Sequence, residues 1–241
     1  MEALLRAART LRTQVEALHF AAPVDTVYNP LRYAWDLHAQ YLTRYARPGI
    51  AALLVGMNPG PFGMAQTGVP FGEVATVRDW LGLHGSVQQP PRVHPKRPIE
   101  GLECRKSEVS GRRLWGLFQD HYGTAAACAA ELFVTNYCPL VFMSASGANL
   151  TPDKLPADER MLLQAACDTH LVAVVRTLRP RLVIGVGGFA QKRAAAALAT
   201  AGDATLVATI LHPSPASPAA NRGWAPQATR QLIDLGIWRT P

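Results

Sequence analysis

The 241-residue sequence lacks any apolar run long enough to span a lipid bilayer, so no membrane partner is expected. It is also poor in cysteine: Cys104, Cys128, Cys138 and Cys167 are the only four, and no two of them form a C-x-x-C pair. Reduced thiols in an intracellular protein are therefore the simplest interpretation. Internal repeats and low-complexity linkers are absent as well. We expect a single domain over residues 1–241.

An export signal is also missing from the beginning of the sequence. Residues 1–20 spread Glu and Arg among Ala and Leu, which is typical of an amphipathic helix and not of a continuous apolar signal core. We therefore expect a protein that stays inside the cell. Nearly half of the residues are hydrophobic (49%), which is enough for one sizeable folded core and excludes a disordered chain.

Acidic residues are outnumbered, with 17 Asp and Glu against 24 Lys and Arg, which gives a formal net charge of +7. This charge suits a polyanionic partner, although the bias toward Arg could also reflect genome composition. Basic residues gather between positions 92 and 113. Two interpretations of this stretch stay open at this point: contacts to phosphates, or a solvated loop.

The hydrophobic pattern predicts strands that alternate with helices. Four short apolar runs are typical of buried parallel strands: residues 50–55, 132–135, 181–185 and 205–211. Helical periodicity covers residues 2–18, 31–45, 73–83, 110–122, 125–131, 157–178 and 188–199, and a last helix begins near Pro226. Ser110 is the expected N-cap of its helix. This order predicts an α/β fold, a three-layer α/β/α domain with a central four-stranded parallel sheet.

Polar side chains follow three of the predicted strands within three residues: Asn58, Asn136 and His212. The carboxyl ends of parallel strands meet at one edge of a sheet, where ligands bind in open α/β folds. Phe71 lies in the loop that also holds Asn58. The pattern therefore predicts one small pocket with two amides, one imidazole and an aromatic wall.

The loop after the first predicted strand is the most informative segment. Residues 56–72 are rich in Gly and Pro, which gives a rigid, bare backbone at a strand end. Residues 56–74 closely resemble the first active-site motif of the single-strand-selective monofunctional uracil-DNA glycosylases, a branch of the uracil-DNA glycosylase superfamily. Residues 132–140 and the His-Pro-Ser-Pro segment within 212–224 resemble further motifs of this family, and the resemblance extends over about residues 29–224.

The resemblance implies a monofunctional DNA glycosylase that hydrolyses the N-glycosidic bond of uracil by base flipping and leaves an abasic site. It implies that Asn58 positions the attacking water and that His212 donates a hydrogen bond to uracil O2. Phe71 would stack on the flipped base, and Asn136 would read its N3–H and O4, a pattern that cytosine reverses. Met57, Gly60 and Met64 would complete the base-binding pocket.

The same resemblance extends to substrate range and cofactors. Gly60 and Gly63 leave room near the C5 edge, so we expect release of C5-modified uracils such as 5-hydroxymethyluracil. No Lys lies in the three motifs, so a Schiff-base lyase step is not expected. No metal or other cofactor is implied. Other branches of the superfamily hold an iron–sulfur cluster on four cysteines, but their first motif differs from this one.

The predicted DNA contacts lie mainly in the loop after His212, the expected wedge that fills the space left by the flipped base. The residues assigned to DNA binding are Ser110, Gly187, Pro213, Ser214, Pro215, Ala216 and Arg222. Animal members of the family carry a basic residue at the position of Ala216, so weaker extrusion of bases from duplex DNA is expected. The partner is uracil-containing DNA, single- or double-stranded, and a monomer is expected. Location would be cytoplasm or nucleoid in a bacterium and the nucleus in a eukaryote.

Two alternatives come from the residues themselves. A non-catalytic binder of damaged or single-stranded DNA would keep Phe71 and the basic surface, but would not need Asn58 and His212 together. A nucleotide-dependent enzyme could use the glycine-rich residues 185–188, which resemble half of a dinucleotide fingerprint. The pattern is incomplete because position 190 is Ala, and we favour backbone N–H groups at this helix start contacting a DNA phosphate.

Overall fold

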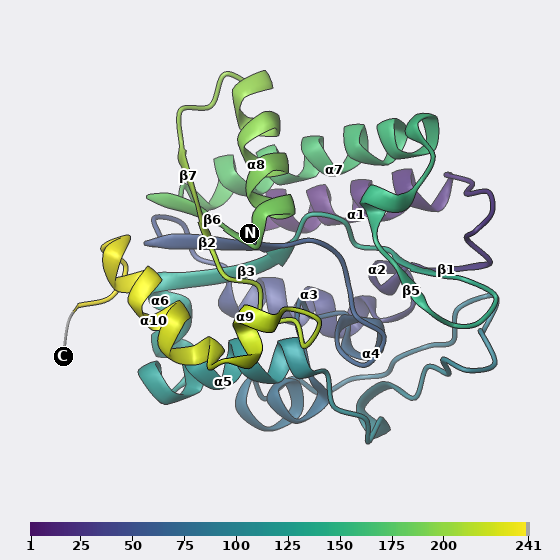
Figure 1. Cartoon of the computed structure of the whole chain (residues 1–241), viewed down its shortest axis with the longest axis horizontal. Helices are drawn as coiled ribbons and strands as arrows, with labels where there is room; N and C mark the ends of the chain where they lie inside the picture. The colour runs from purple at the N-terminus through teal and green to yellow at the C-terminus, as the bar shows by residue number, and fades with distance from the viewer. Residues whose placement is uncertain (240–241) are drawn as a thin grey trace.

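A four-stranded parallel sheet forms the centre of the computed structural model, which describes residues 1–239 (Figure 1). Its strands are β2 (Ala52–Gly56), β3 (Leu132–Asn136), β6 (Leu182–Val186) and β7 (Leu206–Ile210), in the order β3-β2-β6-β7. All neighbouring pairs are parallel, as the apolar runs predicted, and the strand bounds differ from the prediction by one or two residues. Connections leave β2 and β6 toward opposite edges of the sheet, so a topological switch point lies between these two strands.

Helices cover both faces of this sheet, which confirms the predicted three-layer α/β/α architecture (Figure 1). One face carries α1 (Glu2–Glu16), α7 (Ala157–Leu178) and α8 (Gly188–Thr200). The other carries α3 (Trp35–Tyr45), α5 (Val109–Tyr122), α6 (Ala125–Glu131) and α10 (Trp224–Asp234). β2, β3 and β6 are buried along their whole length, because helices pack on both sides of them.

Three of the helices differ from the prediction in where they begin or in their helix type. The helix expected over residues 31–45 is broken at Ala34 into α2 (Pro30–Tyr33) and α3. The helix expected over residues 73–83 is largely a π-helix, η1 (Thr76–Trp80). The prediction of Ser110 as an N-cap was wrong: α5 begins at Val109, and Glu108 occupies the N-cap position. Glu108 makes no capping bond there, because its carboxyl group instead accepts a hydrogen bond from the Phe62 N–H.

A second, antiparallel sheet was not predicted. It consists of β1 (Thr26–Tyr28), β4 (Val141–Met143) and β5 (Asn149–Leu150), and such short strands give little periodic signal. The Tyr28 hydroxyl donates to Arg97 O at 2.7 Å and accepts from the His94 N–H at 2.8 Å. These bonds tie the irregular, proline-rich residues 84–104 to the small sheet. Strand β5 of this sheet and the residues after it lie near the carboxyl edge of the parallel sheet.

Short elements complete the chain: α4 (Met64–Thr67), α9 (Pro218–Asn221), η2 (Gly101–Glu103) and η3 (Pro152–Lys154). All four cysteines are buried and none is disulfide-bonded. Over residues 1–239, every helix is too short or too polar to cross a membrane.

Candidate active site

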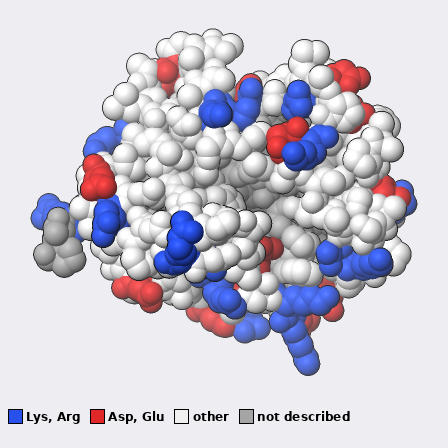
Figure 2. Space-filling model, in the orientation of Figure 1, with Lys and Arg blue, Asp and Glu red and all other residues white. Residues whose placement is uncertain are grey.

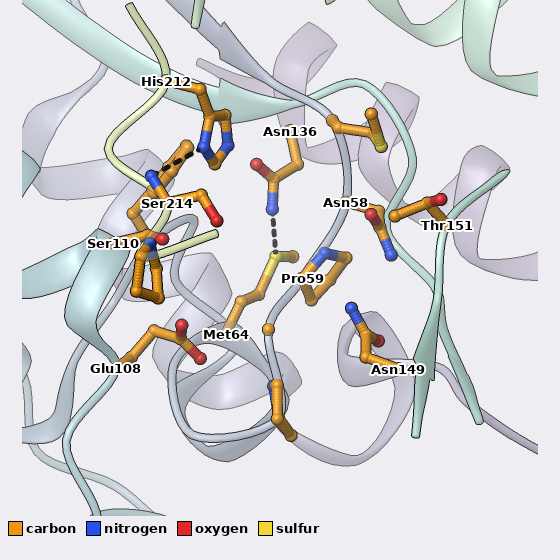
Figure 3. A pocket seen from close by; sticks show the side chains of 15 residues that line it. Asn58, Pro59, Met64, Glu108, Ser110, Asn136, Asn149, Thr151, His212 and Ser214 are labelled. Atoms are coloured by element: carbon orange, nitrogen blue, oxygen red, sulfur yellow. Dashed lines mark hydrogen bonds between the residues drawn. The ribbon is translucent and has the colours of Figure 1, made fainter. Parts of the chain in front are cut away.

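A cavity of about 410 Å³ opens at the carboxyl edge of the parallel sheet, at the place the strand pattern predicted (Figure 3). Its lining comes from the loops after β2 and β7, from the end of β3, from the start of α5 and from the small sheet. The lining residues are Met57, Asn58, Pro59, Gly60, Pro61, Met64, Phe71, Glu108, Ser110, Asn136, Asn149, Thr151, His212, Ser214 and Pro215. Asn58, Asn136 and His212 therefore converge, although they are far apart in the sequence.

Gly56, the last residue of β2, makes this convergence possible. A Cβ atom at this position would lie 2.3 Å from Asn136 Oδ1 and 2.4 Å from Phe71 Cε2. Neither contact is sterically possible, so only glycine allows the amide and the aromatic ring to approach the strand end together. The bare backbone of the first motif is thus a packing requirement of the site.

Asn136 ends β3 and is almost fully buried, with 6% of its surface exposed. Its Nδ2 donates a weak hydrogen bond to Met64 Sδ at 3.3 Å, which the dashed line in Figure 3 marks. Its Oδ1 has no hydrogen-bond partner in the described part of the chain. A buried acceptor without a partner is costly, so this oxygen is well suited to a ligand that brings a donor into the cavity.

Asn58 lies in the loop after β2, and Figure 3 shows it and His212 on opposite sides of Asn136. Asn58 Nδ2 donates to Leu140 O at 3.3 Å, which fixes the orientation of the amide. The side-chain oxygen is left as an acceptor. An amide has no useful basicity, so this group can hold and orient a water molecule but cannot deprotonate it strongly.

His212 follows β7, and its protonation state is set by its surroundings. The Ser214 N–H donates to Nδ1 at 3.0 Å, so Nδ1 is an acceptor and the ring proton resides on Nε2. Burial lowers the pKa of His212 to about 4. The ring is therefore a neutral hydrogen-bond donor at neutral pH. Gly187 packs against it, since a Cβ there would lie 3.1 Å from His212 Cβ.

Phe71 forms the aromatic wall, in a backbone conformation that is rare for its residue type. Its φ is +55°, and its ring centroid lies 6.1 Å from that of His212. Helix α5 packs directly behind it, because a Cβ at Gly111 would lie 2.0 Å from Phe71 O. Such strain persists only where the surrounding structure enforces it, and it is common at binding sites. In residues 1–239, the N–H groups of Phe71 and Met57 donate no hydrogen bond and are free for a ligand.

Glu108 lines the cavity although no sequence motif indicated it. Its carboxyl group accepts from the Phe62 N–H at 3.2 Å and lies over Gly60 and Gly63. A Cβ at Gly60 would come within 2.2 Å of Glu108 Oε2. The room that these glycines were expected to leave is therefore partly filled by this side chain. Burial raises the pKa of Glu108 above its ordinary value, and repulsion from Glu73 adds to this, against the bond from Phe62.

The other unpredicted lining residues are Pro59, Pro61, Asn149 and Thr151. The two prolines lie within residues 56–74, the segment that resembles the first family motif, and could have been predicted from it. Asn149 and Thr151 reach the cavity only because β5 pairs with β4, and no sequence signal identified that short pairing.

The predicted wedge forms part of the cavity rim. Ser214, Pro215 and Ser110 line the cavity, whereas Pro213, Ala216, Arg222 and Gly187 do not. Pro213 is buried, whereas Ala216 and Arg222 are exposed. Arg113 of α5 holds this loop: its Nη1 donates to Pro213 O at 3.0 Å and its Nη2 donates to Asn221 Oδ1 at 3.1 Å.

The Gly187 N–H group cannot make the predicted phosphate contact. The Gly187 N–H donates to Ile210 O at 2.9 Å as part of the sheet edge, so it is not available to a phosphate. Helix α8 begins at Gly188, and a phosphate contact at this helix start would have to use the N–H groups that follow Gly187.

Lys and Arg side chains surround the cavity without lining it (Figure 2). Figure 2 shows a hollow with mostly uncharged walls near the middle of this face and basic groups spaced around it. In the basic stretch of residues 92–113, some cations are engaged with the protein. Arg92 pairs with Asp25 at 3.1 Å, and Arg97 donates to Gly147 O at 3.0 Å. Arg105 and Lys106 are exposed beside them.

Comparisons with known proteins show the family of this chain. The sequence profile of the Uracil DNA glycosylase superfamily matches residues 43–232. The single-strand selective monofunctional uracil-DNA glycosylase of Rattus norvegicus is 50% identical over 236 residues, covering 98% of this chain and 85% of the rat protein. The Bos taurus protein of the same name is also 50% identical over 236 residues, covering 98% of this chain and 87% of its own length.

A solved structure with the same fold is wild-type SMUG2 of Pedobacter heparinus, which superposes with a TM-score of 0.62 at 17% identity. The match covers 96% of this chain and 95% of that chain, and at this identity it supports the fold alone. The profile match and the mammalian relatives show the family. The chain belongs to the single-strand selective monofunctional uracil-DNA glycosylase family, within the uracil-DNA glycosylase superfamily.

Proposed function

We propose that this protein releases uracil from DNA by hydrolysing its N-glycosidic bond, in single strands and after base flipping from duplexes. The observation that carries the proposal is the unpartnered, buried Oδ1 of Asn136, in one cavity with Asn58 and a neutral His212. These are the groups that a uracil base, a water molecule and a developing negative charge would each require.

Recognition of the base would come from Asn136 and Phe71. The Oδ1 acceptor of Asn136 fits the N3–H donor of uracil, and Nδ2 fits O4 once it leaves its weak bond to Met64 Sδ. Cytosine presents an acceptor at N3 and a donor at C4, so both groups would be left unpaired, which is strongly disfavoured in a buried site. The face of Phe71 offers stacking that is worth about 1–3 kcal/mol per base.

The C1′–N1 bond would break first, and its electron pair would stay on N1 of the departing uracil. The resulting anion is delocalised onto O2 and O4. The neutral His212 would donate from Nε2 to O2, and the free N–H groups of Met57 and Phe71 would add further donors. Because His212 is already neutral and oriented, it would stabilise the anion without first losing a proton.

Water held by Asn58 would then attack C1′, where the sugar has oxocarbenium character. The oxygen of the water becomes the 1′-hydroxyl, and the proton that it loses neutralises the uracil anion. Asn58 acts in this scheme by orienting the water and not as a base. None of the four lysines lines the cavity, so no amine is placed to form a Schiff base with the abasic sugar.

The loop after His212 is the proposed wedge. Its tip at Pro215 and Ala216 is exposed beside the cavity opening, and Arg113 holds its base. C5-modified uracils are included in the proposed substrate range, with the C5 substituent directed toward Gly60 and Glu108.

The test is release of uracil from a single-stranded oligonucleotide with one uracil, by the wild type, Asn58→Ala and His212→Ala. We expect release by the wild type, a loss of about 100-fold or more in each variant, and an abasic strand that breaks only in alkali. DNA binding without release of any base would contradict the proposal and support a non-catalytic lesion-binding protein. Strand breakage without alkali would contradict the hydrolytic, lyase-free mechanism.

A further inference from the structure

We propose that Glu108 selects among C5 substituents of the bound uracil, favouring groups that donate a hydrogen bond and rejecting anionic ones. This inference rests on the proposed function and deepens it, because Glu108 would act on the base in the same cavity. Glu108 comes from the start of α5, outside the three motifs of the resemblance.

The position of Glu108 follows from the order of groups along the cavity wall. Figure 3 shows His212, Asn136, Met64 and Glu108 following one another in an arc, with Ser214 and Ser110 on its open side. A uracil with O2 at His212 and N3 and O4 at Asn136 presents C5 as the next ring atom in the same direction. The Glu108 carboxyl group is therefore the ionisable side chain at the C5 edge of the base.

The carboxyl group is fixed in place from two sides. One oxygen, Oε2, accepts from the Phe62 N–H at 3.2 Å. Gly60 and Gly63 leave space for the side chain, since Cβ atoms at these positions would lie 2.2 Å from Oε2 and 2.9 Å from Cγ. Within residues 1–239, the second oxygen, Oε1, has no hydrogen bond. An oriented acceptor thus remains beside the cavity.

A 5-hydroxymethyl group can donate its hydroxyl proton to this acceptor, whereas a 5-carboxylate would meet a like charge. Hydrogen bonds to charged groups are stronger than neutral ones, and buried like charges repel strongly. Plain uracil makes neither contact. Glu108 is therefore expected to change the ranking of substrates without taking part in bond breakage.

Glu108→Gln separates this role from that of a structural tether, because the Gln oxygen can still accept from the Phe62 N–H. The amide then presents N–H donors to the cavity and carries no charge. Release from single-stranded oligonucleotides would be measured for uracil, 5-hydroxymethyluracil and 5-carboxyuracil at slightly alkaline pH. Glu103→Gln, an exposed carboxylate on the preceding turn, is the control for loss of one negative charge.

We expect Glu108→Gln to lower the 5-hydroxymethyluracil to uracil ratio of kcat/KM by about tenfold and to raise the 5-carboxyuracil to uracil ratio by a similar factor. Glu103→Gln should leave both ratios unchanged. Equal changes for all three substrates would show a tether only and overturn the inference, as would unchanged ratios. A wild type that releases uracil but not 5-hydroxymethyluracil would also overturn it. Absence of uracil release would instead remove the proposed function itself.

Discussion

The floor of the cavity and its rim are built in opposite ways. The floor residues Gly56, Phe71 and Asn136 lie at strand ends or in a loop packed against α5, and steric contacts hold them. The rim loop after His212 is exposed at Pro215 and Ala216 and is held by hydrogen bonds, two of which come from Arg113. The proposed base recognition thus falls on sterically held residues, and the proposed wedge on an exposed loop. Mutations in the two regions should therefore have different effects on uracil release.

Gly56→Ala tests the rigid floor and should have the largest effect. The added Cβ cannot coexist with Asn136 Oδ1 and the Phe71 ring, so both must move away from the base. Misplacement of such groups by about 1 Å costs about 100-fold in rate, and we expect at least this loss of uracil release. Gly116→Ala is the control, since a Cβ there meets no atom within 4 Å. Full activity of Gly56→Ala would show that the floor is not sterically fixed.

The pH dependence of the reaction tests the protonation state of His212, which lies between the floor and the rim. Its pKa is lowered to about 4, so the neutral donor persists on acidification and kcat/KM should stay flat between about pH 8 and 6. Because the folded pKa lies below the unfolded value of 6.5, the neutral state stabilises the folded protein above pH 6.5. That stability, up to about 3 kcal/mol, is lost as the pH falls from 6.5 toward 4. An acid limb of kcat/KM centred near pH 6.5 that His212→Asn abolishes would contradict this.

Arg113→Met tests whether the rim depends on its hydrogen bonds. Loss of the bonds to Pro213 O and Asn221 Oδ1 should loosen the wedge, which matters most when a base must be extruded from a duplex. We expect about a tenfold loss on double-stranded substrate, equivalent to about 1.4 kcal/mol, and a smaller loss on single strands. Arg112→Met, an exposed neighbour, controls for lost charge. Equal losses on both substrates would contradict a wedge.

Ala216→Arg should have the smallest effect and the opposite sign. A cation at the exposed tip of the rim adds about one phosphate contact, so binding should strengthen several-fold at low salt and the salt dependence should steepen by about one unit. Ala225→Arg, exposed on α10, carries the same added charge outside the wedge and serves as the control. A steeper slope in both variants would indicate a general charge effect.

The floor could be predicted from the sequence because its signals are local. Apolar runs fixed the four parallel strands, and the polar residues after them then had to converge at one edge. The rim and the side walls depend on contacts between distant segments. Asn149 and Thr151 enter the site through the pairing of two very short strands, and Glu108 enters through the Phe62 N–H and the space over Gly60.

The wrong N-cap and the revised phosphate contact have the same origin. Ser110 has the residue type that favours an N-cap, yet the N-cap lies two residues earlier at Glu108, whose carboxyl group accepts a tertiary hydrogen bond from the Phe62 N–H. The glycine at position 187 was expected to offer its N–H to a phosphate, but sheet pairing with Ile210 uses it. In both cases the residue type suggested a role, but contacts with distant segments determine the N-cap of α5 and the hydrogen-bond partner of the Gly187 N–H.

A crystal structure of Asn58→Ala bound to a single-stranded oligonucleotide with one uracil would show directly which groups of the cavity read the base. We predict the uracil inside the cavity with its face on Phe71, N3 and O4 within hydrogen-bond distance of the Asn136 amide, and O2 facing His212 Nε2. A uracil that remains outside the cavity, or that turns its N3–O4 edge away from Asn136, would rule out recognition of the base by the Asn136 amide.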